Sequence, residues 1–146
     1  MRMFLWALSL IFFAAAPAAA MEPDAIGHIQ TLKGKASVAR GGNTVPAAVG
    51  IPLFNGDAVR TAKAASASIV MADDSVLSLG SSSEIVLKNF VFNPKEGKFS
   101  FVTRMAKGTF SYLSGIISKL SPGSIQMETP DASISVRGTK LLVKVE

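Results

Sequence analysis

Apolar and polar side chains alternate along short stretches of this chain, and residues that favour turns end each stretch. The first two stretches, Ile26–Leu32 and Gly34–Arg40, are followed by the turn residues Gly41–Asn43. Successive side chains of a β-strand point to opposite faces, so the alternation predicts two strands with one apolar face each. Glycine adopts positive φ at little steric cost, which favours a hairpin turn after the second stretch.

The most regular alternation lies in the centre of the chain. Three short apolar runs are separated by the turn residues Asp73–Ser75 and Gly80–Ser83, and the runs carry Ile69, Leu77 and Ile85 at intervals of eight residues. Short strands at steady spacing are typical of a β-sandwich, a barrel or a β-solenoid. The spacing is too brief to indicate a true repeat.

The second half of the chain adds a hairpin, a further strand and a helical turn. Two pairs of phenylalanines flank the turn Asn93–Gly97, which predicts a hairpin within residues 88–102 with aromatic pairs on one face. A separate strand is predicted over Gly108–Leu113, and a single helical turn over Ser114–Leu120. These elements again favour strands over helices.

Prolines and the absence of helical periodicity complete the prediction of the fold class. Proline lacks the N–H that a central strand needs, so Pro46 and Pro52 place Val45–Ile51 at a sheet edge or in a loop. Asn55–Asp57 is a strong turn signal between apolar residues. No stretch after the first 20 residues keeps a helical period over 12 residues, so we expect an all-β domain.

The last eighteen residues, Thr129–Glu146, predict a strand, a kink at Arg137–Gly138 and a second strand. The kink has two interpretations. The arginine either offers its guanidinium to an anionic or carbonyl partner, with the glycine permitting a bulge, or it caps turn carbonyls and pins the connection. Asp57 and Arg60 similarly predict an Asx-type turn with a nearby ion pair.

The first 20 residues predict a cleavable signal peptide. Arg2 supplies a positive charge, Met3–Phe13 forms an apolar block, and an A-x-A cleavage site ends at Ala20. A membrane span needs about 20 apolar residues, and the strongly apolar block is shorter, which favours cleavage over a retained anchor. We therefore expect one domain over residues 21–146, periplasmic or secreted, with no transmembrane helix after cleavage.

Charge and cysteine content narrow the classes of partner. The chain has 15 basic and 10 acidic residues, a net charge of +5, and losing Arg2 with the signal peptide leaves +4. The basic residues are scattered singly, so the basic patch interleaved with aromatics that indicates nucleic-acid binding is missing. Attraction to anionic envelope polymers stays open. Without cysteine, stability has to come from packing rather than disulfides.

Few residues are suited to catalysis or metal binding. His28 is the only histidine, and no G-x-S-x-G nucleophile motif occurs. Asp73 and Asp74 offer carboxylate oxygens, but a calcium ion needs about 6–8 oxygen ligands, and a solvated turn explains the pair better. We expect no catalytic residue, no metal and no cofactor, and a protein that is not an enzyme.

Three motifs, taken together, resemble the FecR domain. The first is the glycine and apolar pattern of residues 27–42, the second runs from Gly50 to Glu84, and the third is T-P-x-A-x-x-x-V-R-G-T over Thr129–Thr139. They occur in order and span about residues 27–145. The positions that we single out as possible interaction residues are Gly56, Asp57, Arg60, Thr129, Pro130, Arg137, Gly138 and Thr139.

The resemblance implies a β-rich, solenoid-like or roll-like fold without catalytic residues, with a β-sandwich as the alternative. In the namesake of the family, this domain lies in the periplasm as part of a sigma regulator and senses an outer-membrane iron-siderophore receptor. This sequence shows no cytoplasmic anti-sigma segment, so we expect a binding or relay module without the sigma-regulating part. We expect an envelope protein as partner, or alternatively peptidoglycan or another anionic glycan. The oligomeric state stays open.

Overall fold

The computed structural model describes residues 25–146, and the predicted signal peptide lies outside this range. The described part contains twelve strands, one short helix, α1 (Ile116–Leu120), and one 3-10 turn, η1 (Pro122–Ser124). The strands are β1 (Gly27–Lys33), β2 (Ala36–Arg40), β3 (Asn43–Pro46), β4 (Pro52–Leu53), β5 (Ala58–Thr61), β6 (Ser66–Met71), β7 (Val76–Leu79), β8 (Glu84–Asn93), β9 (Lys98–Leu113), β10 (Ile125–Glu128), β11 (Ser133–Ser135) and β12 (Lys140–Val145).

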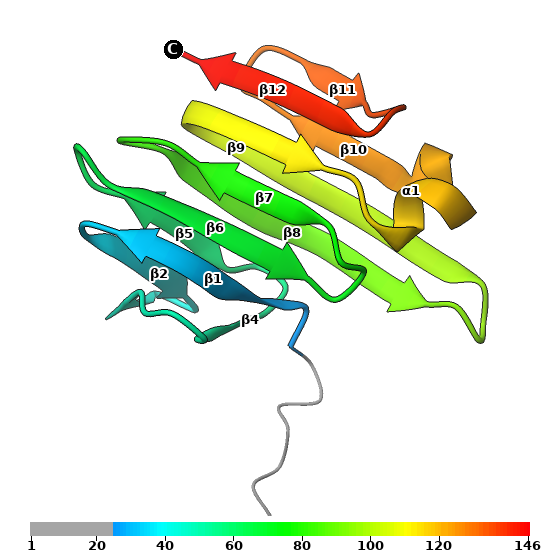
Figure 1. The fold of residues 1–146 in the computed structure, drawn as a ribbon, viewed down its shortest axis with the longest axis horizontal. Coiled ribbons are helices and arrows are strands. Elements are labelled where there is room, and N and C mark those ends of the chain that lie inside the picture. The colour runs from blue at the N-terminus through cyan, green and yellow to red at the C-terminus, as the bar shows by residue number, and fades with distance from the viewer. Residues whose placement is uncertain (1–24) are drawn as a thin grey trace, which may run out of the picture.

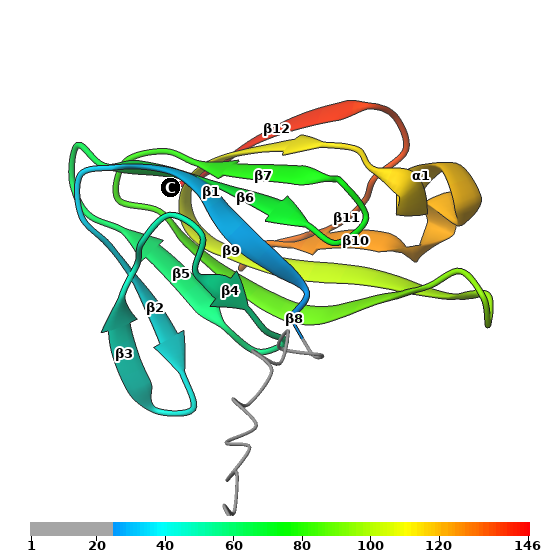
Figure 2. The same cartoon turned by 60° about the horizontal axis from the view of Figure 1, so that its bottom comes forward.

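The strands form one sheet that curls over on itself into a half-barrel (Figures 1 and 2). We call β1, β4, β6, β7 and β12 the front wall, and β2, β3, β5, β8, β10 and β11 the back wall. β9 belongs to both walls, because its first half pairs with β8 and β10 and its second half with β7 and β12. All pairs are antiparallel except β9–β10. The prediction of an all-β, roll-like domain is confirmed.

The chain crosses between the two walls repeatedly at one side of the roll. Three connections, β1 to β2, β5 to β6 and β7 to β8, lie beside the bend within β9 and are hydrogen-bonded to one another. Each of the three connections, and the bend in β9, contains a residue with positive φ. These residues are Gly34, Ala64, Ser82 and, at the bend, Gly108. Hydroxyls satisfy the backbone there: Thr61 Oγ1 accepts the Ser83 N–H at 2.9 Å, and Ser83 Oγ accepts the Thr109 N–H at 3.1 Å.

The bend at Gly108 corrects one prediction. The sequence predicts a hairpin strand up to Val102 and a separate strand from Gly108, whereas the structure has a single 16-residue strand, β9. Gly108 has φ +105°, and a Cβ there would lie 2.5 Å from the Ser83 Cα. Glycine therefore lets one strand turn from the back wall to the front wall where a side chain would collide.

The core lies between the walls, and the apolar residues spaced eight apart are in it. Ile69, Leu77 and Ile85 are all buried. Leu77 lies between Ile69 and Tyr112 in the front wall, while Ile85 pairs with Met105 in the back wall. The interval of eight residues thus returns an apolar side chain to the core on each passage of the chain.

The predicted hairpins and helical turn are confirmed. Gly41–Gly42 forms a two-residue turn between β2 and β3. The β8–β9 hairpin pairs Phe90 with Phe101, edge to face at 5.3 Å between ring centroids, and Phe92 with Phe99 at 6.2 Å. The helical turn expected after β9 is α1.

Candidate functional site

The predicted Gly56–Arg60 segment leads from an exposed turn into β5, and Asp57 within it is buried. Both Asp57 carboxylate oxygens accept hydrogen bonds from the Arg40 guanidinium, Nε to Oδ1 at 2.9 Å and Nη2 to Oδ2 at 2.7 Å. The Phe54 N–H also donates to Oδ2, at 2.9 Å. The expected turn and ion pair are present, but the partner of Asp57 is Arg40, whereas Arg60 pairs with Glu84 at 3.1 Å.

We call this arrangement the Arg40–Asp57 lock. The Asp57 side chain is 1% exposed, and that of Arg40 is 40% exposed. The guanidinium lies 4.5 Å from the Phe54 ring centroid, and the Gly56 N–H donates to the Leu87 carbonyl at 2.7 Å. Because donors within the protein occupy the Asp57 oxygens, the lock fastens the β4–β5 turn to β2 and β8 and offers no carboxylate to a ligand.

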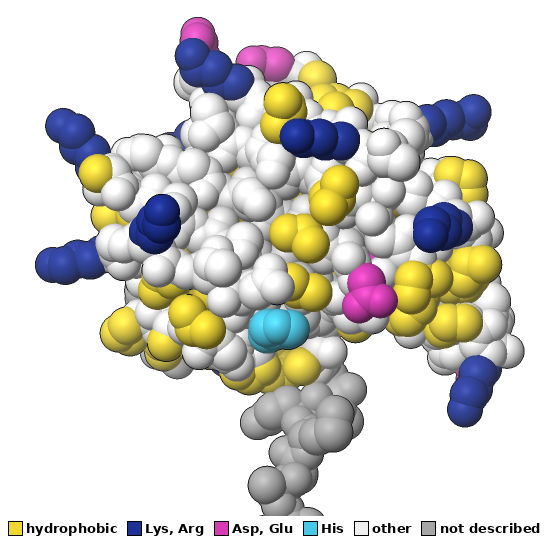
Figure 3. Space-filling model, viewed as in Figure 1, with side chains coloured by type: hydrophobic (Ala, Val, Ile, Leu, Met, Phe, Trp, Pro, Cys, Tyr) yellow, Lys and Arg dark blue, Asp and Glu magenta, His cyan; other side chains and the backbone are white. Residues whose placement is uncertain are grey.

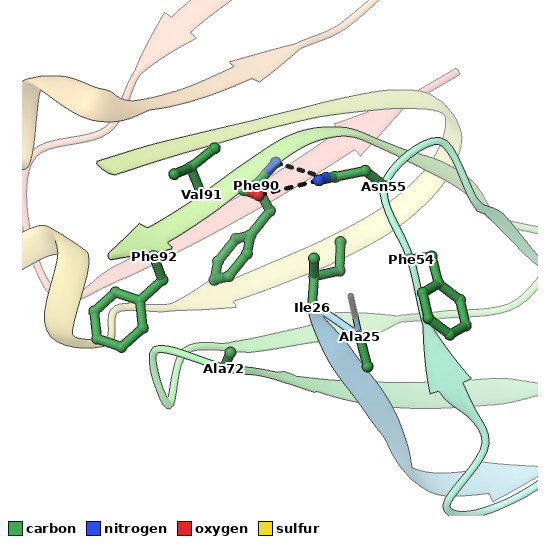
Figure 4. A pocket seen from close by; sticks show the side chains of 8 residues that line it. All are labelled: Ala25, Ile26, Phe54, Asn55, Ala72, Phe90, Val91 and Phe92. Atoms are coloured by element: carbon green, nitrogen blue, oxygen red, sulfur yellow. Dashed lines mark hydrogen bonds between the residues drawn. The ribbon is translucent and has the colours of Figure 1, made fainter. Parts of the chain in front are cut away.

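Beside the lock lies an open hollow of about 530 Å³ (Figure 4). Phe54, Phe90 and Phe92 are among the residues that line it, and Asn55 donates to the Phe90 carbonyl and accepts its N–H. No ionisable side chain lines the hollow. It can contact apolar groups, but it holds no acid, base or nucleophile for chemistry.

Asp73 is buried, contrary to the prediction of a solvated turn, whereas its neighbour Asp74 is exposed. Asp73 Oδ1 accepts the Ser75 hydroxyl at 2.6 Å, and Oδ2 accepts the Ile117 N–H of α1 at 3.3 Å. Burial raises the pKa of the nearby Tyr112 to about 12, and the Asp73 carboxylate adds to the rise. Asp73 thus holds α1 against the sheet. Among residues 25–146, no three or more histidine, cysteine, aspartate or glutamate side chains are grouped so that they could hold a metal ion.

The second predicted segment begins with a turn between β10 and β11. The Thr129 N–H donates to the Ala132 carbonyl at 2.8 Å, and Thr129 Oγ1 accepts the Ala132 N–H at 3.1 Å. Pro130 lies exposed within this turn. The Thr-Pro motif therefore closes a hairpin, and Thr129 uses its hydroxyl to do so.

Arg137 and Gly138 form the predicted kink before β12. Arg137 is exposed and makes no hydrogen bond or ion pair with any of residues 25–146. The expected capping of turn carbonyls by this arginine is therefore not observed. Gly138 has φ +133° with open space around it, and the carbonyl of Thr139 accepts the Ser114 N–H at 2.9 Å. A binding role for Arg137 stays a prediction.

Four strands of the described sheet pair with only one neighbour, and they differ in length. β3, β4 and β11 contain two to four residues each, and Pro46 and Pro52 lie in β3 and β4. β12 contains six residues, has no proline and pairs only with β9. Short strands and prolines protect sheet edges from further pairing. β12 is therefore the edge best suited to receive another strand.

Hydrogen-bond alternation shows which residues of β12 face its open side. Ser114 and Thr139 form a hydrogen-bonded pair at the end of the β9–β12 ladder. In an antiparallel ladder, such pairs alternate with pairs whose backbone groups point away from each other. The odd-numbered residues of β12 therefore direct N–H and C=O toward β9. The residues that direct these groups to the open side are Lys140, Leu142 and Lys144.

The same three side chains are exposed on the outer face of the front wall. Lys140 forms no ion pair within the described residues, and Lys144 reaches only Glu146, at 3.5 Å between two exposed groups. Leu142 between them is 69% exposed. Figure 3 shows a mostly uncharged centre on this face, with lysine and arginine side chains standing apart from one another. The β12 edge thus combines open backbone groups, two cations and an apolar side chain.

A family comparison covers the second predicted segment and all of the first except Gly56. The family model described as FecR protein matches residues 57–146. The chain belongs to the FecR family. This family is generally regulatory and non-catalytic. No curated protein and no solved structure matches this FecR protein. Within residues 25–146 of the FecR protein, no helix has the length and apolar character needed to cross a membrane.

Two features of the FecR domain escaped sequence reasoning. Arg40 lies 17 residues before Asp57, so no local spacing marks them as partners. The only signal was the place of Arg40 in the first motif of the resemblance, just before the glycine turn. The open groups of β12 were also missed, because they depend on which side of the strand β9 occupies.

Proposed function

We propose that this FecR domain is a non-enzymatic module of the bacterial cell envelope that binds a protein partner by adding one of the partner's strands to β12. The open β12 edge is the single observation that carries the proposal. β12 is the longest of the described strands that pair with a single neighbour, and it has no proline to prevent pairing. The predicted signal peptide supports a periplasmic or secreted location.

Strand addition fits the chemistry of this edge. Lys140, Leu142 and Lys144 together present three N–H donors and three C=O acceptors to the open side. When an extended segment joins a sheet edge, main-chain hydrogen bonds supply affinity, and alternate side chains supply specificity. The segment would therefore recognise both the backbone of β12 and the exposed side chains beside it.

Two candidates for catalysis have partners within the domain and the third has none to orient it, which supports a non-enzymatic role. The oxygens of Asp57 and Asp73 accept hydrogen bonds from within the domain. The His28 side chain is exposed on β1 and forms no hydrogen bond with a described residue. A general base needs a nucleophile or substrate proton within hydrogen-bonding reach and a third group to orient it, and His28 has no orienting group.

Peptidoglycan or another anionic glycan is the alternative partner, and it has weaker support. On the face that Figure 3 shows, the basic side chains stand singly and do not gather into a cationic groove. Binding through scattered lysines would weaken steeply with salt, because ions screen exposed charges beyond about 8 Å at physiological ionic strength. Salt dependence therefore separates the two classes of partner.

The test compares two variants at the centre of the β12 edge. Leu142→Pro removes the outward N–H without removing a bond to β9, and Leu142→Thr removes the leucine side chain but keeps that N–H. Each protein is immobilised and incubated with a detergent-solubilised envelope extract of the native host at low and high salt. Mass spectrometry then identifies the eluted protein and sugar.

The proposal expects one envelope protein that high salt does not remove from the unmodified protein or from Leu142→Thr, and that Leu142→Pro fails to retain. Equal capture by both variants would place the interface elsewhere. Glycan fragments that high salt removes would support the alternative, and the absence of any specific binder would overturn both.

A further inference from the structure

We propose that the strand received by β12 is acidic, with Asp or Glu side chains four positions apart that lie opposite Lys140 and Lys144. This inference rests on the proposed function and specifies the chemistry of its partner. It follows from the direction of the β12 side chains, from the apolar residues behind them and from the local balance of charge.

The spacing follows from the pairing geometry. Lys140, Leu142 and Lys144 alternate along β12 and share the outer face of the sheet. Residues directly opposite on paired strands have Cβ atoms about 4.5–5.5 Å apart. An added strand therefore places every second side chain against one of these three. Two acidic residues would face the lysines, and the residue midway between them would face the exposed leucine.

The inner face of β12 determines the remaining positions of the partner. Leu141, Val143 and Val145 are only partly buried and pack against the core at its margin. On the partner strand, two residues alternate with the three that face Lys140, Leu142 and Lys144. Their side chains would point to the inner face of the sheet, toward the margin of the core. Apolar side chains there would cover the margin of the core and remove more apolar surface from water. The expected pattern is acidic, apolar, any residue, apolar, acidic.

The local charge favours an acidic partner over a second copy of this chain. Arg137, Lys140 and Lys144 lie at or just before β12, against the single carboxylate side chain of Glu146. Pairing two copies through this edge would bring together six cations and two carboxylate side chains. In the antiparallel register centred on Leu142, each Lys140 would face a Lys144, and like charges directly opposite destabilise a strand pair.

The test uses three fluorescent seven-residue peptides. The first has glutamate at its second and sixth positions and valine at its third and fifth; the second has lysine in place of both glutamates. The third moves one glutamate from the sixth to the fifth position, which puts the two acids on opposite faces. Anisotropy measures their affinity for the protein, for Leu142→Pro and for the charge-reversed double variant Lys140→Glu, Lys144→Glu. Circular dichroism checks that both variants fold.

The unmodified protein should bind the first peptide about tenfold more tightly than the second, since two cross-strand ion pairs are gained. It should bind the third peptide with intermediate affinity, since that peptide keeps one of the two ion pairs. Charge reversal should invert the preference between the first two, and Leu142→Pro should abolish binding. Equal affinity for all three peptides, or no binding of any, would overturn the acidic partner.

The proposed function is judged separately, by whether capture of an envelope protein depends on the Leu142 N–H. Size-exclusion chromatography with light scattering tests whether a second copy of the chain occupies the β12 edge instead. A dimer that dissociates in Leu142→Pro would show that a second copy occupies the edge, and it would overturn the acidic strand.

Discussion

The Arg40–Asp57 lock and the β12 edge both present charged groups, but the protein treats them in opposite ways. In the lock, the aspartate is buried and its oxygens accept hydrogen bonds from Arg40 and from the backbone. At the edge, Arg137 and Lys140 have no partner among the described residues, and the backbone of three residues faces outward. Groups with partners inside the domain maintain the fold, while groups without them are available for binding.

Removing the lock arginine should have the largest effect on stability. Arg40→Ala leaves the buried Asp57 carboxylate without its ion-pair partner, which should cost about 3 kcal/mol, the low end for broken buried pairs because Arg40 is partly exposed. Arg137→Ala should change the free energy of unfolding by less than about 0.5 kcal/mol. Urea denaturation of both variants measures the difference, and equal losses would contradict the comparison.

Two glycines with positive φ sharpen the comparison at the level of the backbone. Gly108→Ala adds a collision with Ser83 to the strain of positive φ and should cost about 2–3 kcal/mol. Gly138→Ala meets open space beside the β12 edge and should cost only the strain, about 1 kcal/mol. Thermal unfolding followed by circular dichroism compares them, and a greater loss at Gly138 would disprove the assignment of crowding to the β9 bend.

Proline at two adjacent positions of β12 tests the direction of its backbone groups. Val143→Pro should remove a hydrogen bond to Phe110 of β9 and cost about 2 kcal/mol. Leu142→Pro loses only an N–H that faces the open side and should cost less than about 1 kcal/mol. Their free energies of unfolding are compared directly, with Val143→Ala and Leu142→Ala as controls. Similar losses would mean that our reading of the ladder is wrong.

The buried hydroxyl of Tyr112 should give the smallest effect at neutral pH. It has no hydrogen-bond partner in the described structure, so Tyr112→Phe should leave stability unchanged or raise it by about 1 kcal/mol. The unfolded tyrosine ionises near pH 10 and the folded one near 12, so the unmodified protein should lose stability as pH rises through this window.

The Tyr112→Phe variant should lose less stability in that window. Tyr112 is the only tyrosine, so absorbance of tyrosinate follows its ionisation directly. Ionisation near pH 10 while the protein is still folded would contradict the buried environment. An equal loss of stability in both proteins would assign the pH effect to other groups.

Local pattern was sufficient for much of the fold. Alternation placed Ile69, Leu77 and Ile85 on the apolar faces of strands, because successive residues of a strand point to opposite faces, and all three are buried. The glycine turn after Arg40 and the aromatic hairpin were predicted for the same reason, since both depend on neighbours in sequence. The division of β9 into two strands was wrong, because Ser83, far away in the chain, decides how the backbone passes Gly108.

The candidate site could be predicted only in part. The third motif located the kink at Arg137–Gly138 and the strand after it, but alternation along β12 cannot say which side of that strand β9 occupies. The side that β9 occupies determines whether the backbone N–H groups of Lys140 and Lys144 or those of Val143 and Val145 stay free to bind a partner. The sequence also could not predict that Arg40 is the partner of Asp57, since Arg40 belongs to another hairpin.

The sequence by itself therefore determined the β class, the turns, the apolar faces of strands and the resemblance to the FecR domain, because each depends on the order and spacing of nearby residues. Only the tertiary structure decided that Asp57 is enclosed by Arg40, that Arg137 stays exposed and that β12 has an open edge. Those outcomes depend on which strands lie side by side once the sheet has curled. Pairing between distant strands places some charged groups inside the fold and leaves others on its surface.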